Sequence, residues 1–342
     1  MWRRIRARSA VAVLVLLAAG WVAGKWFSSS PREQIGGPRY LIVNADDFGL
    51  SDGVSEGILQ SWRDGVTTST SAMMNMPGAP QRLARARAQY PDLPIGLHLN
   101  ITGGRPVLPP KQAPTLVDAN GEFYTNATIL EHLPNISLDE LSAELHAQAK
   151  LFVATAGKFD HIDYHHHMVA LYTPFYPVVR ELAKEYGVPV RQPVPESVYG
   201  HIKLAGGGGA GEAIGQMIHF GLHRPRLAWR LMRYMGPQAF KRQAALLDEE
   251  NIPTPNWFVD GYYGKPSVEN FISMLRQLQP GISEVMAHPA NVDSQLSATG
   301  GDHTRQRQTE LQVLIDPRVK EAVAKYNVRL VNFSFLSRSN AR

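Results

Sequence analysis

Short apolar runs alternate with amphipathic stretches along most of the chain, and this alternation predicts strands separated by helices. Strands are predicted at 41–43, 94–100, 159–163, 188–191, 257–259, 284–287 and 328–333, and a strand followed by a loop is predicted at 66–76. Apolar residues at helical spacing predict helices at 51–63, 79–89, 138–152 and 173–186. A capping-box pattern begins the third helix at Ser137, and Gly157 and Gly187 end the third and fourth.

Strands that alternate with helices form parallel β-α-β units. About seven such pairs, with no internal repeat, favour a distorted TIM-like α/β fold, the (β/α) barrel, over an open doubly wound sheet. No glycine-rich phosphate fingerprint follows any predicted strand, and the glycine run 206–209 is interpreted as a hinge. We predict that residues 38–342 form this barrel domain; the role of the insertion at 206–242 stays open.

The N-terminal end has a different pattern from the rest of the chain. Four arginines within the first eight residues precede an apolar run at 10–24, which is typical of an export signal or a signal anchor. As a helix this run spans about 22 Å, less than the roughly 30 Å of a hydrocarbon core. We expect residues 1–27 to be a signal peptide or membrane anchor and 28–37 to be a linker. The barrel would then lie outside the cytoplasm, on the periplasmic side.

Charge and cysteine content exclude several classes of function. The formal net charge is +5, but without the four N-terminal arginines the chain has 31 basic and 30 acidic side chains. The body of the protein is therefore nearly neutral, and we expect no nucleic-acid partner. The chain has no cysteine, which excludes disulfides, thiolate metal ligands and a cysteine nucleophile.

Acidic and histidine side chains stand at the predicted carboxyl ends of four strands, where barrels build their sites. Asp46 and Asp47 follow the first strand, and His98, His165 and His288 stand at the ends of three later strands. One carboxylate and two imidazoles form an open ligand set for a divalent metal, which acidifies bound water and polarises a carbonyl. A neighbouring carboxylate can accept the proton of that water, and a distant histidine can protonate a leaving group.

The motifs around these residues resemble those of the YdjC/ChbG-like carbohydrate deacetylases, which are (β/α) barrels related to the polysaccharide deacetylases. The motifs are NADDFGLS at 44–51, GLHLN at 96–100, HIDYHHH at 161–167 and AHPA at 287–290, in the family's order. The resemblance covers residues 40–192 well and the C-terminal third more loosely. It implies removal of N-acetyl groups from sugars with the help of one divalent cation.

The resemblance also implies roles for individual residues. The implied roles are metal ligand for Asp47, His98 and His165, general base for Asp46, general acid for His288, and support of the base for Arg191. The chain departs from the family pattern at 168–174, where a late histidine is absent and the loop before Pro174 is longer. The implied metal ligands lie outside this departure, whereas the sugar contacts on this rim stay open.

Several alternatives remain at this stage. A non-catalytic glycan-binding protein can keep the same fold, and metal-dependent phosphoesterases also use Asp and His, although two-metal sites need more carboxylates than these motifs offer. Two imidazoles favour Zn²⁺, while the family resemblance leaves Mg²⁺ open. We expect an acetylated saccharide as substrate; the sugar and the oligomeric state stay open, and the N-terminal segment makes membrane contact an option.

Two further stretches have two interpretations each. Arginines at 226, 230 and 233 share one face of a helix predicted within 224–242, which is either an outer helix of the barrel or a surface for anionic lipid. Aromatic residues at 257, 262 and 263 follow another strand, and they either pack in the core or stack on sugar rings.

Overall fold

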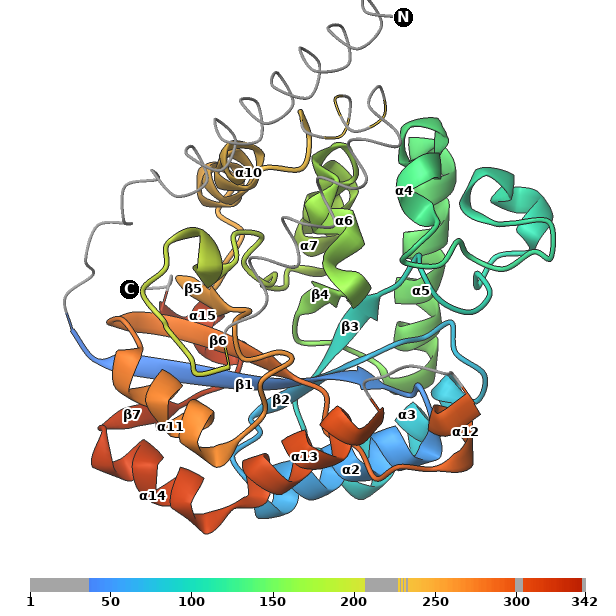
Figure 1. Cartoon of the computed structure of the whole chain (residues 1–342). Helices are drawn as coiled ribbons and strands as arrows, with labels where there is room; N and C mark the ends of the chain where they lie inside the picture. Colours follow the sequence, from blue (N-terminus) through green and yellow to red (C-terminus); the bar gives the residue numbers. More distant parts are fainter. Residues whose placement is uncertain are drawn as a thin grey trace, which may run out of the picture.

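A parallel sheet of seven strands forms the centre of the molecule (Figure 1). The computed structural model describes residues 37–206, 227, 229, 231, 233–298 and 304–339. The strand order is β4-β3-β2-β1-β6-β5, and β7 pairs with the beginning of β1. The strands are β1 (Arg39–Phe48), β2 (Ser69–Ala72), β3 (Ile95–Leu99), β4 (Ile162–Tyr164), β5 (Trp257–Val259), β6 (Gly281–Ala287) and β7 (Val328–Leu330).

The sheet curls, and a connecting segment joins its two end strands. The N–H of Arg191 donates to the carbonyl of Ile162 in β4, and Pro195 forms a parallel bridge with Phe258 in β5. The curled parallel sheet confirms the predicted (β/α) barrel architecture. The predicted strand at 188–191 is wrong in extent, since only Val190 forms a bridge there. The prolines in and after this stretch lack the N–H that a continuous ladder requires.

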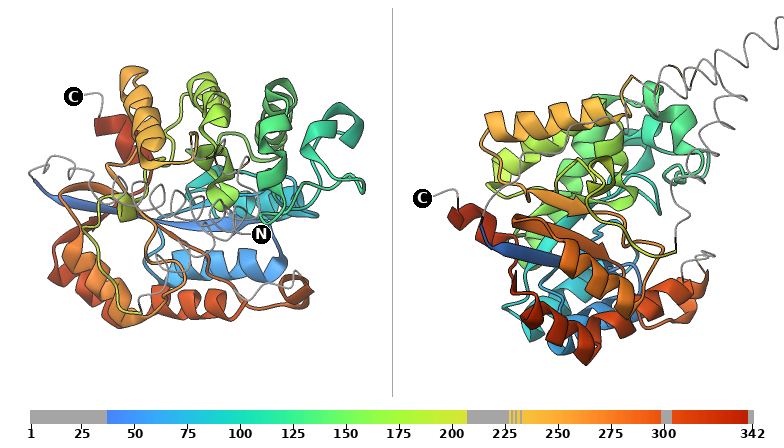
Figure 2. Two further views of the ribbon diagram at one scale, coloured as in Figure 1. Left: turned by 45° about the horizontal axis from the view of Figure 1, so that its top comes forward. Right: turned by 60° about the vertical axis from the view of Figure 1, so that its left-hand side comes forward.

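Helices cover both sides of the curled sheet (Figure 2). The longer ones are α2 (Asp52–Asp64), α3 (Ala79–Gln89), α5 (Leu138–Ala156), α7 (Tyr176–Tyr186), α10 (Pro237–Glu249), α11 (Val268–Gln277), α13 (Thr304–Ile315) and α14 (Pro317–Lys325). The shorter ones are α4 (Ile129–His132), α6 (Met168–Leu171), α12 (Ser294–Ala298) and α15 (Ser334–Ser339). The Ser137 hydroxyl accepts from the N–H of Glu140, which confirms the predicted cap of α5.

Alternate residues of β1 face opposite sides of the sheet, as the pleat requires. Leu41 and Val43 pack in a cluster with residues of α11 and α14 outside the sheet. Asn44 faces the interior, where its amide donates to Asp46 and to Asp163 at 2.8 and 3.0 Å. The interior at this level is therefore polar, and its buried charges need partners within the protein.

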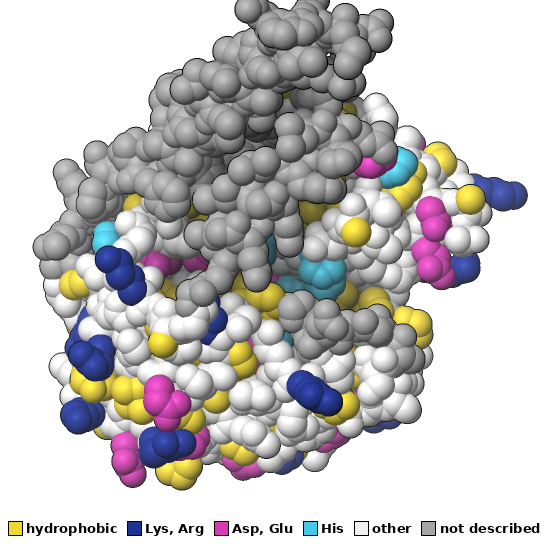
Figure 3. Space-filling model, viewed as in Figure 1, with side chains coloured by type: hydrophobic (Ala, Val, Ile, Leu, Met, Phe, Trp, Pro, Cys, Tyr) yellow, Lys and Arg dark blue, Asp and Glu magenta, His cyan; other side chains and the backbone are white. Residues whose placement is uncertain are grey.

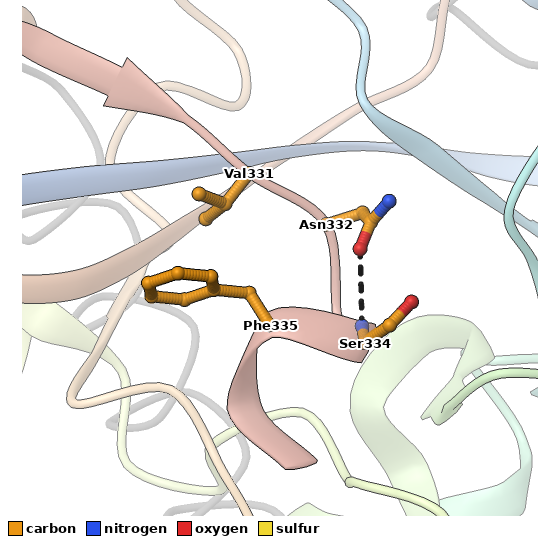
Figure 4. A pocket seen from close by; sticks show the side chains of 4 residues that line it. All are labelled: Val331, Asn332, Ser334 and Phe335. Carbon is orange, nitrogen blue, oxygen red and sulfur yellow. Dashed lines mark hydrogen bonds between the residues drawn. The ribbon is translucent and has the colours of Figure 1, made fainter. Parts of the chain in front are cut away.

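The residues after β7 fill the opposite, apolar end of the interior. Phe333 is fully buried in a cluster with Ile42 and Ile282, and its ring stacks on the imidazole of His161 with centroids 3.7 Å apart. A hollow of about 190 Å³ beside this cluster is lined by Val331, Asn332, Ser334 and Phe335 (Figure 4). It lies next to β7, which pairs with the beginning of β1, far from the carboxyl end where the candidate residues stand.

Some predicted elements differ from the structure or lie outside its described part. Within 224–242, Gly236 is extended and caps a helix that begins at Pro237; residues 226 and 230 are not described, so the predicted arginine face stays a prediction. Within the described ranges no helix is long and apolar enough to cross a membrane. The signal or anchor at 1–27 precedes the first described residue, so it stays a prediction, as does the periplasmic location.

Candidate active site

The side chains of Asp46 and Asp47, although consecutive, reach the same end of the sheet because the end of β1 is irregular. The pairing of β1 with β2 shifts register between Ala45 and Phe48, as in a β-bulge. Asp47 has a φ of 72°, a conformation that few residues other than glycine, asparagine and aspartate adopt. Neighbours in a regular strand would point to opposite faces. The bulge instead lets the side chains of Asp46 and Asp47 both contact groups at the carboxyl end of the sheet.

Asp47, His98 and His165 converge from three separate strand ends. Oδ1 of Asp47 lies 3.2 Å from Nε2 of His98 and 3.0 Å from Nδ1 of His165. One ligand-type atom from each residue lies within 4.8 Å of the others, a spacing that suits a single metal ion. Asp47 and His98 are fully buried, whereas His165 is partly exposed, so the cluster is open toward solvent on that side. The donor set therefore fits an open divalent site.

The second nitrogen of His98 is held from inside the barrel. Its Nδ1 lies 2.8 Å from Oδ1 of Asp163, and Oδ2 of Asp163 accepts from the hydroxyl of Ser71 at 2.7 Å. A carboxylate on the far nitrogen fixes the tautomer and the ring orientation of a metal-binding histidine. Asp163 thus aims Nε2 of His98 at Asp47.

Arg191 is the centre of the buried charge group beneath this cluster. Its Nη1 and Nη2 donate to the two carboxylate oxygens of Asp46, each at 2.7 Å. Nη2 also lies 2.9 Å from Asp163, and Nε donates to Glu284 at 2.7 Å. A bidentate guanidinium–carboxylate pair fixes both partners in one plane. Asp46 therefore has a fixed orientation, while the implied role of Arg191 as support of a general base stays a prediction.

The charges around these groups set their protonation. Burial would raise the pKa of Asp46, but the positive charge of Arg191 outweighs it and lowers that pKa. Burial likewise opposes ionisation of Asp47, yet Arg307 and His165 bring its pKa well below the usual range. Burial would lower the pKa of His98, but Asp163 and Asp47 raise it to about 10. Without a metal ion, both aspartates are ionised at neutral pH and His98 carries a proton on each nitrogen.

His288 stands at the same end of the sheet, directly after β6. Ala45 pairs with Ala287, so His288 and Asp46 follow at the same level of adjacent strands. The backbone N–H of His288 donates to Glu310 on α13, and its Nδ1 lies 3.8 Å from the same carboxylate. Among the described residues, His288 makes no hydrogen bond to Asp46 or Asp47. Its position suits a group that acts on a substrate lying between it and the aspartates.

Four charged residues of the site are absent from the sequence-based prediction. They are Asp163, Glu284, Arg307 and Glu310. The first two had a signal, because each is an acidic residue within a short run predicted to be a buried strand. The two residues of α13 had none, since no motif surrounds them.

The remaining aromatic and histidine residues have mixed positions. Trp257 and Tyr262 are buried, so they pack in the core and do not stack on sugars. Tyr263 is 37% exposed, and its ring lies 5.0 Å from that of His288. His166 packs on the ring of His165 at 3.9 Å. Figure 3 shows a group of histidine side chains near the centre of this face of the molecule.

Comparison with known proteins identifies the family. Residues 40–325 match the family model for YdjC-like protein. The chain is 33% identical over 298 residues to a carbohydrate deacetylase of Brevibacillus brevis, covering 86% of this chain and 99% of that protein. It is 33% identical over 300 residues to a chitooligosaccharide deacetylase of Yersinia pestis, covering 86% and 98%.

A solved structure agrees with the fold. It comes from Enterococcus faecalis V583 and is described as a candidate cellobiose-phosphate cleavage protein. It has 27% sequence identity and a TM-score of 0.70, and the match covers 88% of this chain and 99% of that one. The match over most of the chain and the full-length similarity to these relatives show that the chain belongs to the YdjC-like protein family.

Proposed function

We propose that this protein is a metal-dependent hydrolase that removes N-acetyl groups from an acetylated saccharide or glycoconjugate. The observation that carries the proposal is the convergence of Asp47, His98 and His165 beside a separate aspartate held by Arg191. The relatives named carbohydrate deacetylase and chitooligosaccharide deacetylase support the reaction class. Asp47, His98 and His165 would hold one divalent ion, Mg²⁺ or Zn²⁺. When bound, this ion would supply a Lewis acid for the acetyl carbonyl and for a water molecule.

Asp46 is the proposed base. Oδ1 of Asp46 accepts from both Arg191 and Asn44, whereas Oδ2 accepts only from Arg191 among the described residues. A carboxylate oxygen has two acceptor positions, so Oδ2 keeps one for a water proton. As that proton transfers, the water oxygen bonds to the acetyl carbon. The pair with Arg191 keeps this oxygen aimed while the proton moves.

His288 is the proposed acid. The carbon–nitrogen bond breaks after water has added, and a proton from His288 goes to the departing nitrogen. The two proton transfers give acetic acid and a free amine, with the proton of the attacking water on Asp46 and that of His288 on the amine, and the acetic acid then ionises to acetate in solution. Glu310 fixes the backbone of His288 and lies beside its Nδ1 at 3.8 Å, which leaves Nε2 as the nitrogen for the substrate.

The two alternative functions fit the arrangement less well. A two-metal phosphoesterase would need a second cluster, and the only other group of this kind within the described ranges is Asp46, His98 and Asp163. Both of its carboxylates contact Arg191, whose positive charge disfavours a second metal ion there. A non-catalytic glycan-binding protein has no need for a base aligned by a buried arginine. These contacts favour the hydrolase.

The test is acetate release from a panel of acetylated saccharides, with and without a chelator, combined with metal content. His165→Ala should lose both bound metal and activity. Asp46→Asn should lose activity by roughly 10²-fold or more and keep its metal, because removal of a proton acceptor leaves the ligands in place. His146→Ala, on the outer helix α5, is the control and should behave as wild type. Near wild-type turnover by Asp46→Asn would refute the assignment of the base.

A further inference from the structure

Arg307 brings a second positive group to the candidate active site. It lies on α13, 260 residues after Asp47 in the chain, and its Nη2 donates to Oδ2 of Asp47 at 2.6 Å. The other oxygen of Asp47 faces His98 and His165. The two oxygens of the Asp47 carboxylate therefore have different partners, the imidazoles on one side and the guanidinium on the other. The oxygen of Asp47 that faces the two imidazoles is therefore the one positioned to share a cation with them.

A guanidinium at this position does not help the cluster to bind a metal ion. Its positive charge lies against a proposed ligand and would repel a divalent cation. Arg307 is itself largely buried, with 14% of its side chain exposed, so solvent screens this repulsion only weakly. An ion pair that served only to stabilise the fold would not need a metal ligand as its acidic partner, and away from the ligands it would not weaken metal binding. The position therefore calls for a function that uses positive charge at the reacting groups.

The free end of the guanidinium indicates that function. Nη1 of Arg307 is buried and has no hydrogen-bond partner within the described part of the chain. A buried donor without an acceptor is unfavourable, and the penalty disappears when a ligand oxygen reaches it. Tyr263 and Glu310 both interact electrostatically with Arg307, and both also contact His288. Arg307 thus contacts a proposed metal ligand through Nη2 and interacts electrostatically with two residues that contact the proposed acid.

We propose that Arg307 is a catalytic residue that donates through Nη1 to the substrate oxygen on which negative charge develops. Under the proposed function, on which this inference rests, that atom is the carbonyl oxygen of the acetyl group. Electron density moves onto this oxygen when water adds to the carbon and returns when the carbon–nitrogen bond breaks. A fixed donor aimed at such an oxygen lowers the barrier because it needs no rearrangement during the reaction. The bond to Asp47 supplies that fixation.

The test compares Arg307→Lys and Arg307→Met with wild type. The exposed residue Arg305, on the same helix, supplies the control Arg305→Met. The measurements are kcat and KM for acetate release, the Kd for Zn²⁺ or Mg²⁺ by calorimetry, and thermal unfolding. Arg307→Lys keeps the charge but lacks the second donor nitrogen, so kcat should fall about 10²-fold with KM within threefold. Arg307→Met should bind metal at least as tightly as wild type, since the repelling charge is gone, and should be equally slow.

Two results would overturn the inference. One is a kcat for Arg307→Lys within threefold of wild type. The other is a parallel loss of metal affinity and kcat in Arg307→Met, which would mean that Arg307 only positions Asp47. Restoration of kcat in Arg307→Ala by added guanidinium would support a direct role. If the wild-type protein released no acetate, the proposed function would fail, whereas a failure of Arg307 alone leaves active wild-type enzyme.

Discussion

Glu284 offers a quantitative test of the buried charge group, through the substitution Glu284→Gln. This glutamate is fully buried in β6, and its Oε1 accepts from Nε of Arg191 at 2.7 Å. Oε2 has no hydrogen-bond partner among the described residues. Burial, only partly offset by Arg191, raises the pKa of Glu284 from 4.5 to about 7. Glutamine keeps the acceptor for Arg191 and cannot ionise.

The magnitude follows from the difference between the two pKa values. Between pH 4.5 and about 7 the folded protein holds a proton on Glu284 that the unfolded chain has already released. The contribution of Glu284 to the stability of the wild type must therefore fall as pH rises through this window and level off above it. At 1.36 kcal/mol per pH unit, the contribution amounts to roughly 3 kcal/mol. Glu284→Gln lacks this term, so the variant should gain about that much relative to wild type between pH 4.5 and 8.

The assay is urea unfolding of wild type and variant at pH 4.5, 6, 7 and 8. The quantity compared is the difference in free energy of unfolding between the two proteins at each pH. The pKa of Glu196 is also raised to about 7, but Glu196 is present in both proteins and cancels in this difference. Glu321→Gln, at an exposed position on α14, is the control and should track wild type. A difference between Glu284→Gln and wild type that does not vary with pH would refute the reasoning.

Two further predictions concern metal uptake and packing. Because the pKa of His98 is raised to about 10, binding of Zn²⁺ should release about one proton per ion at pH 7, seen by calorimetry in buffers of different ionisation enthalpy; uptake with no proton release would contradict the site. Gly96→Ala should lower the free energy of unfolding by about 1–3 kcal/mol, because an added Cβ overlaps the buried ring of His161. Unchanged urea unfolding of Gly96→Ala would show that the ring can move.

Much of the fold could be predicted from local pattern, because each strand end and helix cap is encoded within a few residues. Helix α3 occupies 79–89 as predicted, and α5 begins at the predicted cap. The strand predicted at 188–191 was wrong in extent because the apolar residues there suggest a strand, whereas the prolines in and after the stretch prevent continuous pairing. Four strand ends bearing Asp or His pointed to one rim, since parallel strands present their carboxyl ends at the same edge.

The partners of these residues were harder to find. An acidic residue in a buried strand, as at Asp163 and Glu284, shows that some partner must neutralise its charge but does not identify that partner. Arg307 contacts Asp47 across 260 residues of chain, and only the placement of α13 beside the sheet creates that contact. The local sequence also does not predict the bulge at Asp47. Aspartate adopts a positive φ in many turns, so its presence there does not indicate a bulge.

The residues beyond the family match have a practical meaning for anyone who shortens this protein. The match ends at residue 325, yet β7 and Phe333 follow it. A polypeptide that ended at residue 325 would lose the ring of Phe333, which stacks on His161 and fills the apolar end of the barrel interior. Water could then enter through this end and hydrate Arg191 and its carboxylate partners. Asp46 would be held less rigidly, although every proposed catalytic side chain was still present.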